Sequence, residues 1–114
     1  MTTTDPSLIT VPARKAAERA RRIRAAEATV ARMRAYAERE AGRLWVFGSF
    51  VTGRMDHDSD LDVMIDFPAA GRRAAWDFLE ALSAEHGLPL DVFERATTKP
   101  AFVARVEADG LRLP

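Results

Sequence analysis

Residues 43–66, RLWVFGSFVTGRMDHDSDLDVMID, decide how this chain folds. Two short apolar runs, 43–47 and 61–67, are rich in Val, Ile, Phe and Trp, which is typical of β-strands. The segment between the two runs is polar and contains two glycines, which indicates a turn or loop. This stretch therefore predicts a strand–loop–strand unit.

Acidic side chains gather where the second apolar run begins. Side chains in a strand alternate between the two faces of a sheet, so we expect Asp60 and Asp62 to project from one face. Leu61, Val63 and Ile65 then point to the other face, toward a core. Neighbouring carboxylates repel each other unless one holds a proton or a cation lies between them. Mg²⁺ prefers oxygen ligands and leaves room for substrate phosphates, so the pair predicts a magnesium site.

A glycine and a serine follow the first predicted strand. Gly48 allows the backbone to approach a ligand closely. Ser49 offers a hydroxyl where a short helix over 49–54 would begin, and backbone N–H groups at a helix start favour phosphate. An Asp-rich loop is usually a solvated turn, and a lone Gly-Ser pair means little. Together, with ten residues between Ser49 and Asp60, they favour a functional site.

A third acidic residue lies in the next predicted strand, 88–93. Asp91 stands in the middle of this apolar run, where a carboxylate is costly unless it is exposed, paired or bound to a metal. A solvent-facing edge position would explain it in isolation. Beside Asp60 and Asp62, it is better explained as a third active-site carboxylate. Three carboxylates next to a phosphate-binding turn suit two-metal phosphoryl or nucleotidyl transfer.

The pattern GSFVTG at 48–53 followed by DSDLDV at 58–63 resembles the signature of the DNA polymerase β-like nucleotidyltransferase superfamily. More narrowly, it resembles the minimal nucleotidyltransferases of the MntA-type antitoxin group. The resemblance implies a nucleotidyltransferase-like fold that uses ATP and two Mg²⁺ ions. It implies catalytic and metal-binding roles for three residues, Asp60, Asp62 and Asp91. It implies nucleotide-binding roles for three others, Gly48, Ser49 and Arg54.

The same resemblance implies the acceptor. Such proteins transfer AMP from ATP to a hydroxyl of a partner, and that partner is commonly a HEPN-domain ribonuclease toxin, so the chain would be an antitoxin. Many relatives carry an arginine at positions matching Phe50 to Thr52. Here the nearest arginine is Arg54, after Gly53. Two alternatives remain open: a docking antitoxin without catalysis, and a small-molecule nucleotidyltransferase of the aminoglycoside type. Small-molecule nucleotidyltransferases of this type generally carry an additional domain that binds the acceptor.

Composition excludes several other classes of protein. The 114 residues include no cysteine, so neither a disulfide framework nor a cysteine-ligated zinc is expected. No run approaches the ~20 apolar residues of a membrane span, and the N-terminus does not resemble a signal peptide. We therefore expect a cytoplasmic protein without membrane contact. The net charge is zero, and a mild basic excess in residues 1–41 is too weak to predict direct binding of nucleic acid.

The rest of the chain predicts an α/β (α+β) fold. After a flexible N-terminus, 1–11, Thr10 caps a long helix over 12–41 that Gly42 ends. Further helices are expected over 72–86 and between Pro100 and Gly110. We expect a small mixed sheet with helices packed on one face, in a single domain, 12–114, with its catalytic core in 42–114.

The surroundings of the site also give expectations. An open cleft in so small a domain predicts assembly, with a HEPN partner or with a second copy of the chain. Four arginines near the start of the first helix could contact RNA or an acidic partner, but a solvated helix face explains them better: Arg19, Arg21, Arg22 and Arg24.

Overall fold

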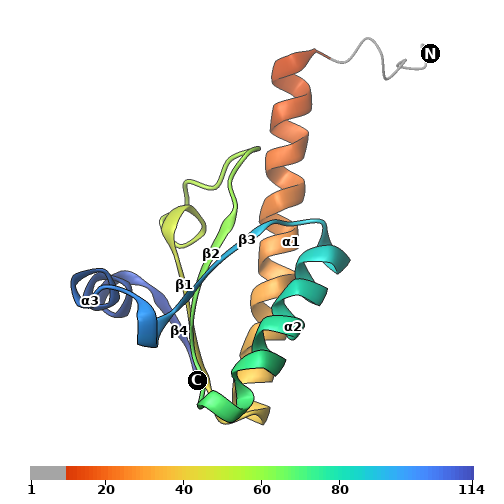
Figure 1. The fold of residues 1–114 in the computed structure, drawn as a ribbon. Helices are drawn as coiled ribbons and strands as arrows, with labels where there is room; N and C mark the ends of the chain where they lie inside the picture. The colour runs from red at the N-terminus through yellow and green to blue at the C-terminus, as the bar shows by residue number, and fades with distance from the viewer. Residues whose placement is uncertain (1–9) are drawn as a thin grey trace.

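The computed structural model describes residues 10–114, which form a four-stranded sheet and three α-helices (Figure 1). Most of the predicted flexible N-terminus therefore lies outside the described residues. The elements follow in the order α1 (Val11–Arg39), β1 (Arg43–Phe47), β2 (Leu61–Asp66), α2 (Ala69–His86), β3 (Leu90–Glu94), α3 (Pro100–Asp109) and β4 (Leu111–Leu113). None of the helices within 10–114 has both the length and the apolar character that crossing a membrane requires.

The sheet is mixed, as predicted, with the strand order β3-β2-β1-β4. Strand β1 pairs antiparallel with β2 and with β4, whereas β2 and β3 run parallel. A parallel pair needs a crossover connection, which α2 supplies. The register places Phe47 opposite Asp62, and Asp62 opposite Asp91. Strand β4 was not predicted, because three residues are too few to show an alternating pattern.

Helices α1 and α2 cover one face of the sheet, and α3 covers the other (Figure 1). The expected packing on one face therefore holds for α1 and α2 but not for α3. The reason lies in the alternation along the strands. Trp45 and Met64 point away from α1 and α2, and these large apolar side chains are buried in a second cluster with Val103 and Val106 of α3.

The long helix α1 begins as predicted. The Thr10 hydroxyl accepts a hydrogen bond from the Ala13 N–H at 3.2 Å, which is the usual N-cap arrangement. The apolar stripe of α1 faces the sheet, with buried side chains at helical spacing: Ala26, Val30, Met33 and Ala37. On the same face, α2 is tied to β3 by a hydrogen bond of 2.7 Å from the Trp76 Nε1–H to the Glu94 carboxylate.

The packing of α1 generates a test of the fold. Met33 is fully buried between α1 and the sheet, so Met33→Ala removes apolar contacts and leaves a cavity. We expect a loss of about 2–5 kcal/mol in the free energy of unfolding. The adjacent exposed residue provides the control, because Arg34→Ala should change stability by less than about 0.5 kcal/mol. Urea denaturation of both variants measures this difference, and equal losses would contradict the packing.

Candidate active site

Two of the predicted site carboxylates lie side by side on the sheet face that α3 partly covers. Asp62 in β2 and Asp91 in β3 are register partners in the parallel pair. Partners on adjacent strands are about 4.8 Å apart and project from the same face. Asp60 precedes β2 by one residue and is exposed. The structure thus brings Asp62 and Asp91 together, with Asp60 at the entrance of the same strand.

The surroundings of Asp62 oppose its ionisation. Its side chain is half-buried, with Phe47 opposite it on β1 and Asp91 opposite it on β3. Burial is the largest cause that raises the pKa of the Asp62 carboxyl, and the negative charges of Asp91 and Asp60 raise it further. A cation bound here would remove this penalty, because an opposite charge nearby favours the ionised carboxylate.

Gly48 lies directly against the Asp62 carboxylate. Its φ is +79°, in the left-handed region that side chains rarely adopt. A Cβ on Gly48 would also overlap the Asp62 carboxylate. Both facts require glycine at position 48. We expected this glycine to let a ligand approach the backbone, but the group that lies against it is the carboxylate of Asp62.

The turn after β1 is tighter than expected. Residues Gly48–Phe50 form one turn of 3₁₀ helix instead of a helix over 49–54. The Gly48 carbonyl accepts from the Val51 N–H, and the Ser49 carbonyl accepts from the Arg54 N–H at 2.8 Å. In both hydrogen bonds Gly48 and Ser49 contribute their carbonyl groups as acceptors. Their N–H groups take no part in these two bonds. Ser49 is half-buried, and Arg54 is exposed at the end of the turn.

The acidic residues fit some metal ions better than others. Within residues 10–114, no group of three or more His, Cys, Asp or Glu side chains is gathered closely enough to enclose a metal. Mg²⁺ is usually held by one or two carboxylates, and water and substrate phosphates complete its shell. The pair Asp62 and Asp91 therefore fits Mg²⁺ bound together with a nucleotide, with Asp60 nearby. A metal that needs a complete protein cage fits poorly.

The arginines near the start of α1 are not one solvated face. Arg19 and Arg24 are exposed, as expected, but Arg21 and Arg22 are half-buried and contact other segments. Arg22 donates to the Ser59 carbonyl, and Arg21 donates to two carbonyls at the end of α2. The expectation was wrong for these two residues. The signal in the sequence was Glu18, which lies three and four residues before them, the spacing of helical ion pairs.

The approach of Gly48 to Asp62 can be tested with two matched glycines. Gly53 has a similar φ of +73°, but a Cβ there would meet nothing within 4 Å. Gly53→Ala should therefore cost only the left-handed strain, about 1–2 kcal/mol. Gly48→Ala should cost clearly more, because its methyl group also displaces the Asp62 carboxylate. Asp62→Ala should stabilise Gly48→Ala by more than it stabilises the wild type, whereas it should change Gly53→Ala and the wild type equally. Urea denaturation of the single and double variants measures this.

Because the pKa of Asp62 is raised in the folded protein, we expect replacement of its carboxylate to stabilise the fold. The unfolded chain ionises Asp62 near its ordinary pKa of 3.8, whereas the folded chain ionises it at higher pH. Protonated Asp62 therefore imposes no penalty on folding below pH 3.8. Asp62 destabilises the folded state once the pH rises above its pKa in the folded chain. Without divalent metal at pH 7, Asp62→Asn should unfold at a modestly higher temperature than the wild type.

This advantage should shrink as the pH falls toward 3.8. Thermal unfolding at a series of pH values, with a chelator present, measures it. The exposed Asp58 in the preceding loop supplies the control, since Asp58→Asn should not reproduce the pH-dependent gain. A gain that is independent of pH would contradict the electrostatic cause.

Comparison with known proteins places this geometry in a family. The family model described as nucleotidyltransferase domain matches residues 31–113, which contain the whole sheet, the Gly48 turn and all three aspartates. No curated protein and no solved structure matches the chain significantly. The family match begins within α1, beyond Glu18, Arg21 and Arg22. The chain belongs to the nucleotidyltransferase domain family.

Proposed function

We propose that this protein is a metal-dependent adenylyltransferase that moves AMP from ATP to a hydroxyl group of a partner protein. The observation that carries the proposal is the in-register pair Asp62 and Asp91, with the Gly48 turn packed against it. Membership of the nucleotidyltransferase family supports nucleotidyl transfer in general. The choice of ATP, Mg²⁺ and a protein acceptor rests on the resemblance to MntA-type antitoxins.

The proposed reaction forms one bond and breaks one. The acceptor oxygen attacks the α-phosphorus of ATP, and the bond from that phosphorus to the oxygen bridging to the β-phosphate breaks, which releases pyrophosphate. Asp91 is exposed whereas Asp62 is half-buried. We therefore assign to Asp91 the orientation of the acceptor hydroxyl and the acceptance of its proton.

The remaining residues bind and position the nucleotide. When bound, Mg²⁺ would neutralise charge on the triphosphate, and Asp62 and Asp91 would hold it, with Asp60 adding negative charge at the entrance of β2. The N–H groups of Gly48 and Ser49, with the Ser49 hydroxyl, would bind the β- and γ-phosphates. Arg54, at the end of the same turn, would add positive charge. Most of the rate enhancement would then come from positioning and from charge neutralisation.

The location of Asp91 supports an acceptor that is itself a protein. Strand β3 lies at the edge of the sheet, and Asp91 is exposed on it. A small acceptor would need a wall on this side, whereas a protein acceptor brings its own surface. We propose a HEPN-domain toxin as this partner, with the chain as its antitoxin in the cytoplasm. A second copy of the chain is the other acceptor to examine.

A labelling experiment tests the proposal. The purified protein is incubated with Mg²⁺, a HEPN-domain protein as the proposed partner, and ATP labelled on either the α- or the γ-phosphate. We expect the α-label, but not the γ-label, to appear on the partner, with a mass gain of whole AMP units. Asp60→Ala/Asp62→Ala should lower the rate at least roughly 10²-fold, the scale for loss of a preorganised electrostatic contact.

Asp58→Ala, an exposed change in the same loop, should leave the rate within a few-fold of the wild type. Transfer of the γ-label would indicate a phosphotransferase instead. Transfer of AMP to a second copy of the chain would support the proposed adenylyl transfer and contradict the proposed HEPN-domain partner. A stable complex without any transfer would make the protein a docking antitoxin, and the proposed catalysis would be wrong.

A further inference from the structure

We propose that Glu18, Arg21 and Arg22 on α1 form a clamp that sets the positions of Asp60 and Asp91 relative to each other. The three are positioning residues, because they hold the two loops that lead into β2 and β3. The proposal rests on the proposed function of those aspartates. It concerns a part of α1 that lies before the residues matched by the nucleotidyltransferase family model, 31–113.

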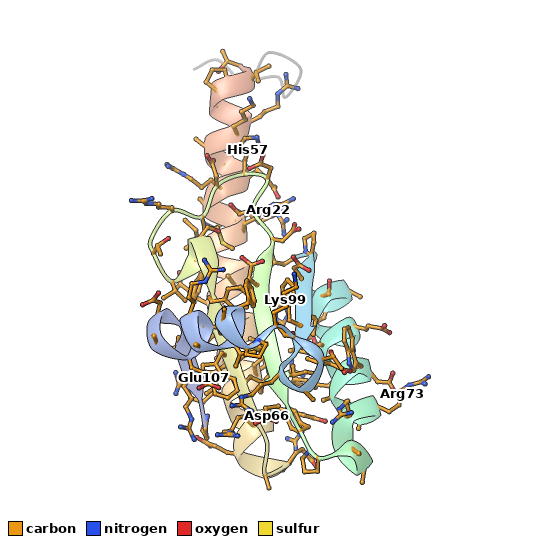
Figure 2. The ribbon with its side chains drawn as sticks, turned by 60° about the vertical axis from the view of Figure 1, so that its left-hand side comes forward. Arg22, His57, Asp66, Arg73, Lys99 and Glu107 are labelled. Carbon is orange, nitrogen blue, oxygen red and sulfur yellow. The ribbon has the colours of Figure 1, made fainter. Side chains whose placement is uncertain are left out.

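The first loop is held by Arg22. Its guanidinium donates a hydrogen bond of 2.8 Å to the Ser59 carbonyl, the residue directly before Asp60. Only 18% of the Arg22 side chain is exposed, and the hydrogen bond itself is partly buried. Ser59 also closes a tight turn, because its hydroxyl accepts from the Asp56 N–H at 2.8 Å. Figure 2 shows Arg22 where the loop that carries His57 crosses α1. The loop therefore reaches Asp60 from a fixed point.

The second loop is held by Arg21. Its guanidinium donates to the carbonyls of His86 at 3.3 Å and Gly87 at 2.9 Å. These carbonyls lie where α2 ends, and the last carbonyls of a helix have no partner within the helix. Two residues further on, the Pro89 carbonyl accepts from the Leu61 N–H at 3.0 Å, which joins this loop to the start of β2.

Glu18 makes the two arginines one unit. Its carboxylate accepts from Arg21 at 2.7 Å and from Arg22 at 3.0 Å. Hydrogen bonds from Arg21 and then Arg22 lower the pKa of Glu18 to about 2. The carboxylate therefore stays ionised at physiological pH and offsets the repulsion between the two neighbouring guanidinium groups.

The geometry points to a local effect at the site more than to a global one. Exposed ion pairs add little to overall stability, and Arg21 and Glu18 are each more than one third exposed. Carboxylates that share a cation, in contrast, must be placed to within about 0.5 Å. Loss of the clamp should hence weaken metal binding while the protein remains folded.

Metal affinity provides the first measurement. Binding of Mn²⁺ alone to the full chain is followed through the loss of the free-ion signal in electron paramagnetic resonance. Arg22→Met should weaken binding about 10- to 100-fold, the usual effect of removing a partner that orients metal ligands. Arg22→Lys can still donate to the Ser59 carbonyl and should restore most of the affinity. Arg24→Met, an exposed change on the same helix, should have no effect.

Hydrogen exchange of the backbone provides the second measurement. Arg22→Met should speed exchange mainly of the amides in 56–60, and Arg21→Met mainly of those in 86–91, with little change in the core of α1. The Leu61 amide, which is bonded to the Pro89 carbonyl, should respond to both changes. Because the variants stay folded, a purely structural role of these arginines would not alter metal affinity or produce this division between loops. Urea denaturation verifies that they are folded.

The outcomes separate the clamp from the proposed function. If Asp62→Asn abolishes Mn²⁺ binding while Arg22→Met leaves both affinity and exchange unchanged, the clamp is overturned and the metal site stands. If Asp62→Asn leaves Mn²⁺ binding unchanged, the metal site of the proposed function fails. Hydrogen exchange then judges the clamp alone: faster exchange in the two loops supports it, and wild-type exchange in both overturns it.

Discussion

The repulsion between two in-register carboxylates is the constraint on which the rest of this structure depends. Asp62 and Asp91 occupy one register position of adjacent strands, and burial together with this neighbour makes the ionised form of Asp62 unfavourable. The fold must supply stability elsewhere to keep them there. It does so on the opposite face, where Leu61 and Val63 are fully buried beneath α1 and α2. Because side chains alternate along β2, the stabilising residues Leu61 and Val63 and the destabilising Asp62 lie on opposite faces of the sheet at adjacent positions.

Sequence reasoning predicted the features that local patterns determine and missed those that depend on long-range contacts. The strands around Gly48 and Asp62 were predictable, because apolar runs and alternation are local. Asp91 was expected near Asp60 and Asp62, but its position directly opposite Asp62 depends on the register of a parallel pair, which the sequence does not specify. The packing of α3 on the second face can be predicted only when it is known that Trp45 and Met64 lie on that face and must be buried there.

The two glycines around β1 show how a correct residue can be given an incomplete reason. Gly42 was expected to end α1, yet the left-handed residue is Ala41, with a φ of +52°. Gly42 is glycine because the Phe67 ring fills the space of a Cβ. In the same way, Gly48 was assigned to ligand approach, and the Asp62 carboxylate is what it first accommodates. Glycine marks a close contact in both places, but only the fold identifies the atom that makes it.

The position of α3 explains why the carboxylates stay accessible. The helix lies across the strands (Figure 2), and its buried side chains cover Trp45 and Met64, which lie further along the sheet than Asp62. At the boundary, the Phe47 and Phe93 rings flank β2 from either side, and their centroids are 5.8 Å apart. The aromatic rings therefore end the apolar layer next to Asp62. The same helix that buries one end of this face leaves Asp62 half-buried and Asp91 exposed at the other end.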